Sequence, residues 1–192
     1  MQVKTPNRPI ERHLIKNAAD WAEGDLYNRG RLRMLKKIMK FGKPYINSFP
    51  EREFAGFKIG IVRGGSESPF GMGIYYPSGM FAAKLIFGFG KKTFKIYALS
   101  GKQSKADMKK ISEKLGKFWA ELLMEKALGH AQELKFKNAE LLNPRHNPEI
   151  DWHQLNKERR SALIAFYEML KKKYKFVGSE TDKYWVKELS AD

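Results

Sequence analysis

The chain has 192 residues and a formal net charge of +16, from 37 Lys plus Arg against 21 Asp plus Glu. Its 42% hydrophobic and 13% aromatic residues are enough for a packed core, which excludes an intrinsically disordered protein. The absence of cysteine excludes disulfides, thiolate zinc sites, iron–sulfur clusters and cysteine nucleophiles.

The length and the segment pattern predict an extended arm at residues 1–8 and a single α+β domain at residues 9–192. No stretch approaches the roughly 18 to 20 consecutive apolar residues that a membrane helix needs, and the first thirty residues are too polar for a signal peptide. We therefore expect a cytoplasmic protein with no membrane partner. The domain divides into a helical hairpin, a β-meander and a C-terminal helical part, at residues 9–50, 54–99 and 104–192.

The N-terminal part is predicted to be two antiparallel helices. Pro9 favours a helix start, and Gly24 ends that helix. Asp25 then caps a second helix, which runs to about Gly42 and is followed by a loop at residues 43–50.

The middle of the chain changes from a period of 3.6 to a period of 2, which is typical of strands. Glycine and proline separate the apolar runs, and the last two connectors are short enough to force hairpins. The pattern predicts a four-stranded antiparallel meander with strands at residues 54–63, 72–76, 80–89 and 93–99.

Capping signals predict the C-terminal helices. Ser104 and Asp107 form a capping-box pattern before an apolar stripe, and this helix is expected to end near Gly129. A further helix is expected over residues 131–142, followed by a loop at 143–148.

Asp151 and Gln154 resemble a second capping box, ahead of a helix that runs to the lysine run at residues 171–173. Residues 181–189 fit a short helix or a strand. The sequence thus predicts an α+β fold in which the N-terminal helical hairpin and the C-terminal helices cover one face of the four-stranded meander.

The positive charge is concentrated in the first half of the chain, since residues 1–102 hold 19 Lys plus Arg and 7 Asp plus Glu. Residues 26–50 contain no acid. A line of cations at helical spacing is typical of a surface that binds a polyanion such as a phosphate backbone, although a solvated helix face is the alternative. The helix residues assigned to nucleic-acid binding are Arg29, Arg33, Lys36, Lys37, Lys40 and Lys43.

The predicted polar face of the meander carries lysine, tyrosine and glycine and no acid. Tyrosine rings can stack on bases while lysines hold phosphates, so this composition fits a nucleic-acid platform. An ordinary open sheet face is the alternative. The residues assigned to the platform are Lys58, Arg63, Tyr75, Lys84, Lys95 and Tyr97.

The order of helix, strands and helix from about Arg31 to Leu123 resembles that of double-stranded RNA-binding domains. The closing helix begins with Gly101-Lys102-Gln103-Ser104-Lys105 and continues through Lys109 and Lys110. In such domains a basic stretch at this helix start meets phosphates across the groove. The resemblance covers about half the chain and implies that Lys102, Lys105, Lys109 and Lys110 contact phosphates.

Signals for catalysis are weak. His146 and His153 flank Glu149 and Asp151, and such a cluster can bind a divalent ion, although Asp151 also fits a helix cap. The meander lacks the paired carboxylates of a two-metal nuclease. We expect no metal and no cofactor.

The sequence therefore favours a non-catalytic protein that binds DNA or RNA largely independently of sequence. One alternative is an assembly subunit of a virion or ribonucleoprotein, in which the 1–8 arm and the sheet contact other copies. The other is a metal-dependent hydrolase built on His146, Asp151 and His153. The choice between DNA and RNA, and between single and double strands, stays open.

Overall fold

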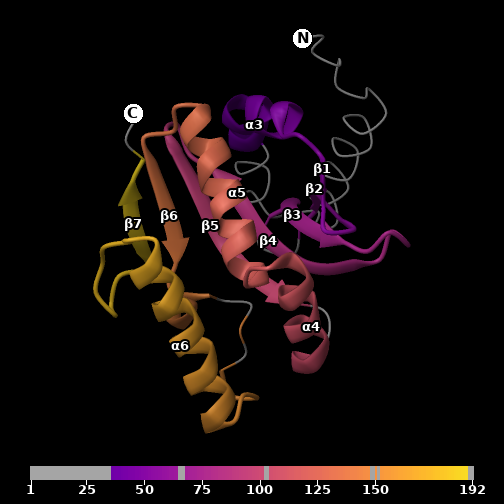
Figure 1. Cartoon of the computed structure of the whole chain (residues 1–192). Coiled ribbons are helices and arrows are strands. Elements are labelled where there is room, and N and C mark those ends of the chain that lie inside the picture. Colours follow the sequence, from indigo (N-terminus) through magenta and orange to yellow (C-terminus); the bar gives the residue numbers. More distant parts are fainter. Residues whose placement is uncertain (1–35, 65–67, 102–103, 148–149, 151, 190–192) are drawn as a thin grey trace, which may run out of the picture.

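The computed structural model describes residues 36–64, 68–101, 104–147, 150 and 152–189, which form a seven-stranded sheet with helices (Figure 1). The strands lie side by side in chain order. They are β1 (Arg52–Phe54), β2 (Phe57–Arg63), β3 (Phe70–Tyr75), β4 (Phe81–Phe89), β5 (Thr93–Gly101), β6 (Asn138–Leu142) and β7 (Tyr184–Glu188). Neighbouring strands are antiparallel except β5 and β6, which are parallel.

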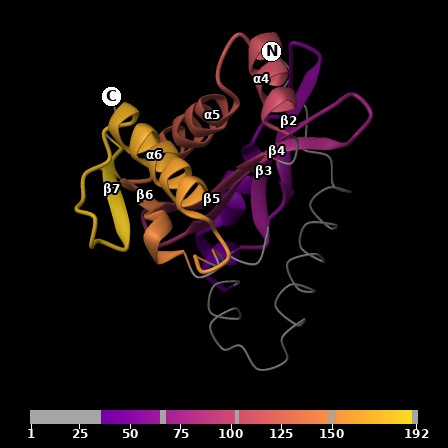
Figure 2. The ribbon, with the colours of Figure 1, turned by 90° about the horizontal axis from the view of Figure 1, so that it is seen from below.

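The helical elements follow the same chain order. They are η1 (Ile38–Gly42), α3 (Lys43–Ser48), α4 (Lys105–Leu115), α5 (Trp119–Glu133), η2 (Pro144–His146) and α6 (Lys157–Lys173). Helices α4, α5 and α6 lie on one side of the sheet (Figure 2). None of the helices in the described ranges combines the length and the apolar character that a bilayer crossing requires.

The predicted four-stranded meander with a helical hairpin and C-terminal helices is wrong, because the sheet has seven strands. The class is still α+β with a mainly antiparallel sheet. Strand β1 adds an edge next to β2, and β6 and β7 come from the part of the chain that was expected to be mostly helical.

Strand β6 shows why the helix expected at residues 131–142 was wrong. Ala, Glu and Leu are good helix formers, so local preference favours a helix here. In the fold, however, Ala139 and Leu141 are buried and pair with β5 at Phe94 and Ile96. Burial between two strands outweighs the local preference.

The helix expected from Ser104 to about Gly129 is two helices. Gly116 adopts φ +64 at the end of α4, and its amide donates to Glu113 and Ser112. This left-handed cap ends the helix because only glycine adopts that conformation without a steric cost. Helix α5 then continues past Gly129 to Glu133.

The structure also bears on three smaller expectations. Residues 43–48 of the expected 43–50 loop form helix α3, and the expected hairpin is described only from Lys36 onward. Asn156 caps α6 and accepts a hydrogen bond from the Arg159 amide, whereas Asp151 lies outside the described residues. In the segment at 181–189, residues 184–188 form a strand.

The main core lies between the sheet and the helices. Its fully buried members include Phe87, Phe94 and Leu85 from the sheet, Leu123 from α5 and Leu170 from α6. A second, smaller cluster on the opposite face groups Ile86, Tyr97 and Leu142.

Candidate nucleic-acid interface

An aromatic cluster lies at the end of the sheet where β4 ends and β5 and β6 begin. Tyr45 of α3 packs 5.4 Å from Phe89 and 5.0 Å from Phe94, measured between ring centroids. Phe136, just after α5, stacks on Phe89 at 5.7 Å. The cluster therefore joins three segments that are far apart in the sequence: η1 and α3, the β4–β5 turn and the α5–β6 connection.

Gly42 brings the first of these segments onto the cluster. A Cβ atom added at Gly42 would lie 2.2 Å from the ring of Phe89, a separation that no real side chain tolerates. The glycine thus lets the backbone of η1 rest directly on the aromatic ring.

The other two segments are joined by hydrogen bonds. The amides of Lys137 and Asn138 both donate to the carbonyl oxygen of Lys92, at 2.9 and 3.2 Å. The α5–β6 connection and the β4–β5 turn therefore form one continuous surface.

Exposed lysines cover this surface, which we call the lysine end. They are Lys40 of η1, Lys91 and Lys92 of the β4–β5 turn, and Lys135 and Lys137 of the α5–β6 connection. No carboxylate of the described residues forms an ion pair with any of them. Two exposed carboxylates lie close by in the chain or the sheet, Glu133 and Glu188, so positive charge predominates. The lysine end is at the top of Figure 1, beside α3 and the start of β6.

Lys135 adopts a conformation that usually belongs to glycine. Its φ is +60 at the end of α5, where its amide donates to the carbonyl of Gln132 and the Phe136 amide donates to that of Ala131. This is the hydrogen-bond pattern of a Schellman cap, in which a left-handed residue satisfies the last carbonyls of a helix. A lysine at this position costs about 1–2 kcal/mol relative to a right-handed conformation.

The structure describes part of the line of cations that the sequence predicts on the second helix. Lys36, Lys37, Lys40 and Lys43 are exposed, and Lys40 lies with its Nζ 5.4 Å from the ring centroid of Phe41. Arg29 and Arg33 lie outside the described residues.

On the sheet face, Lys58 and Tyr75 lie opposite each other in the register of β2 and β3. With Gly60 they line a hollow of about 290 Å³. Burial, reinforced by the nearby Glu51 carboxylate, raises the pKa of Tyr75 to about 12. Glu53 lies 3.8 Å from the Lys58 amine, so this part of the face is not free of acids.

Three further platform residues are occupied by contacts within the protein. The Lys84 amine donates to the Gly64 carbonyl at 3.0 Å, and Lys95 pairs with Glu140 at 2.6 Å. Tyr97 is only 8% exposed. The expected acid-free platform is therefore wrong here, because β6, which was expected to be helical, brings Glu140 beside Lys95. Arg63 lies in β2, but its side chain is outside what the structure describes.

Lys105 is exposed in the first turn of α4, which Ser104 caps by accepting the Asp107 amide at 3.2 Å. Lys102 is outside the described residues. This helix start follows the end of β5, whereas the lysine end lies at its beginning, so the two basic regions are roughly 27 Å apart along a nine-residue strand.

The predicted metal cluster is only partly described. His146 belongs to η2 and His153 follows a turn, but Glu149 and Asp151 lie outside the described residues. Within the residues that the structure does describe, no three metal-binding side chains gather.

A buried histidine in α5 escaped the sequence analysis. Nε2 of His130 lies 3.0 Å from Ser48 Oγ and 3.1 Å from the Tyr45 carbonyl, and Nδ1 lies 3.1 Å from Glu133 Oε2. The Ser48 hydroxyl also lies 2.6 Å from the Pro44 carbonyl of its own helix. The His130 ring and the Ser48 hydroxyl each have a main-chain carbonyl as a partner. We therefore assign to His130 the structural role of holding α3 against α5. Its partners in α3, Tyr45 and Ser48, come more than 80 residues earlier, so no local pattern indicated them.

Comparisons with known proteins identify no relative in sequence: no family model and no curated protein matches this chain. Among solved structures the chain is similar to an acetyltransferase of the GNAT family from Staphylococcus aureus, at 10% identity over 96% of each chain and with a TM-score of 0.38. That degree of likeness says nothing about the activity of this protein.

Proposed function

We propose that this protein binds nucleic acid through the lysine end, without catalysis and largely independently of sequence. The observation that carries the proposal is the convergence of exposed lysines from three separate segments over one aromatic cluster, with no ion pair to a described carboxylate. A cytoplasmic location belongs to the same proposal and rests on the absence of cysteine.

Like charges gathered on one surface repel one another, so the arrangement favours a polyanionic partner. A lysine amine meets phosphate oxygens as a point charge and does not read base edges in a fixed geometry. Binding through such groups gains free energy by releasing the counterions condensed on the nucleic acid. Affinity for any sequence should therefore fall steeply with salt.

The proposal is tested by a charge-reversal variant, K91E/K92E/K137E. Its matched control is K114E/K157E/K172E, which reverses three exposed lysines on α4 and α6. Each triple change lowers the net charge of +16 by six units, so the two variants differ only in where the charge is lost.

The assay is a titration of labelled single- and double-stranded DNA and RNA at salt concentrations from 50 to 200 mM. The wild-type protein should lose on the order of a thousandfold in affinity across this range if it meets about six phosphates. The lysine-end variant should bind much more weakly and with a salt slope shallower by about 0.9 for each lost phosphate contact. Equal weakening in the two variants would mean that net charge alone, and not the lysine end, attracts nucleic acid.

A further inference from the structure

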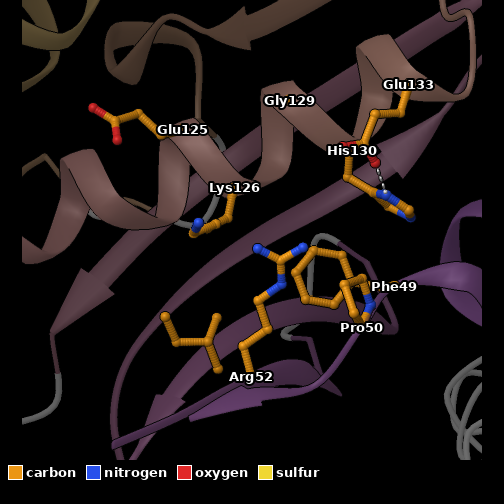
Figure 3. A pocket seen from close by; sticks show the side chains of 9 residues that line it. Phe49, Pro50, Arg52, Glu125, Lys126, Gly129, His130 and Glu133 are labelled. Atoms are coloured by element: carbon orange, nitrogen blue, oxygen red, sulfur yellow. Dashed lines mark hydrogen bonds and ion pairs between the residues drawn. The ribbon is translucent and has the colours of Figure 1, made fainter. Parts of the chain in front are cut away.

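A pocket of about 150 Å³ lies between the first strands of the sheet and helix α5 (Figure 3). One wall comes from the segment around β1 and from β2, and the other from the last three turns of α5. The lining residues are Phe49, Pro50, Arg52, Ile59, Glu125, Lys126, Gly129, His130 and Glu133.

Gly129 stands in the interior of α5 without a packing reason. Glycine in the middle of a helix destabilises it by about 0.5–1 kcal/mol relative to alanine. At Gly42 the Phe89 ring leaves no room for a side chain, but a Cβ added at Gly129 meets no atom within 4 Å. No neighbour in the described structure therefore requires a glycine here, whereas a ligand that approaches the helix backbone closely would require it.

Two cations line the same pocket without a carboxylate partner. The side chains of Arg52 and Lys126 form no ion pair or hydrogen bond with any described residue. The Glu125 carboxylate turns away from the pocket and pairs with Lys117 at 2.6 Å, whereas Arg52 points up toward α5 (Figure 3). Two neighbouring positive groups without partners favour a ligand with more than one negative charge.

The rest of the wall that carries Arg52 is apolar, since it is formed by Phe49, Pro50 and Ile59. Phe49 and Pro50 lie beside Arg52 in Figure 3. Pockets for complete small ligands usually measure about 300–1,000 Å³, so a space of about 150 Å³ holds one end of a ligand and leaves the rest in solvent.

We propose that this pocket binds a phosphate monoester. Arg52 and Lys126 hold the dianionic phosphate, the organic group lies against Phe49, and Gly129 provides the space that a side chain would fill. A phosphate monoester reaches the pocket from one of two sources, a free mononucleotide or the 5′-phosphate at the end of a nucleic-acid strand. The pocket shares no residue with the lysine end, so failure of one set of variants is distinguishable from failure of the other.

The first experiment is calorimetric titration of the full chain with adenosine 5′-monophosphate, adenosine and inorganic phosphate. We expect saturable binding of the monophosphate that is at least tenfold tighter than binding of either fragment. Gly129→Ala should raise the melting temperature by about 1–4 °C and weaken monophosphate binding at least tenfold, so misfolding cannot explain the loss.

Arg52→Gln and Lys126→Gln should each weaken monophosphate binding on the order of tenfold, and the control Lys114→Gln on α4 should not change it. Absence of saturable monophosphate binding overturns the proposal. So does equal affinity for adenosine, or unchanged affinity in Gly129→Ala.

The second experiment identifies the source of the phosphate. If a 5′-phosphorylated oligonucleotide binds more tightly than its 5′-hydroxyl counterpart, and Gly129→Ala removes the difference, the pocket takes the strand end. If the two oligonucleotides bind equally while the monophosphate still binds, the pocket takes the free mononucleotide. Either result supports a phosphate-monoester site.

Discussion

Replacing Lys135 by glycine should make the protein more stable and a weaker binder of nucleic acid. Lys135 ends α5 with a φ of +60, and its side chain is exposed at the lysine end. Stability and binding therefore place opposite demands on this position: the backbone favours glycine, and the proposed partner favours a cation.

The magnitude follows from two opposing effects. Glycine adopts the left-handed conformation without the steric cost of a Cβ, so the substitution stabilises the folded state by about 1–2 kcal/mol. The greater conformational freedom of glycine stabilises the unfolded chain and offsets about 0.4–1 kcal/mol of this effect. The net increase in the free energy of unfolding is about 0.5–1 kcal/mol, which raises the melting temperature of a chain of this length by about 1–4 °C.

Lys175 provides a matched control, because it ends α6 with φ +58 and is also exposed. Lys175→Gly should give the same stabilisation, since the cap geometry is the same: the Phe176 amide donates to Lys171 as the Phe136 amide donates to Ala131. Only Lys135→Gly should weaken nucleic-acid binding and lower the salt slope by about 0.9.

Denaturant melts and salt-dependent titrations of the two variants check these expectations. Stabilisation without any change in binding in Lys135→Gly would remove Lys135 from the interface. Equal weakening in both variants would refute the assignment of binding to the lysine end, and destabilisation of both would refute the reasoning about the caps.

Three further predictions concern the scaffold under the site. Gly42→Ala should destabilise the protein by about 1–3 kcal/mol in urea melts, because the new Cβ meets the ring of Phe89; an unchanged midpoint would show that the aromatic cluster yields easily. Tyr167→Phe should cost about 1–3 kcal/mol and speed hydrogen exchange at Leu99, whose buried amide donates to the Tyr167 hydroxyl at 3.1 Å; unchanged exchange at Leu99 contradicts this. Burial raises the pKa of Tyr45 well above its ordinary value of 10.0, so the folded state keeps this proton above pH 10 while the unfolded state loses it. The free energy of unfolding should thus fall above pH 10 by about 1.4 kcal/mol per pH unit from this residue, and the decline should be shallower in Tyr45→Phe.

The sequence by itself located most of the strands in the middle of the chain. Alternation of apolar residues between Gly and Pro connectors is a local signal, and it depends on neither the number of strands in the sheet nor their partners. The cap at Ser104 was predictable for the same reason, since its hydrogen bond to Asp107 spans only three residues.

The complete sheet was not predictable, because β6 carries a sequence that favours a helix. Its strand conformation depends on the edge that β5 offers to Ala139 and Leu141, and this edge exists only after the chain has folded. The same error left Lys95 without its partner, Glu140, in the sequence-based interpretation.

The sequence also determined that the chain is strongly basic and that its first half carries most of the charge, because charge is a sum over residues. Only the tertiary structure decided which lysines lie together. Lys40, Lys92 and Lys137 are distant in the chain. They lie in three separate segments, and no sequence periodicity relates their positions. Their three segments meet because Tyr45, Phe89 and Phe136 pack together, and packing between distant aromatic rings depends on the folded arrangement of all three segments.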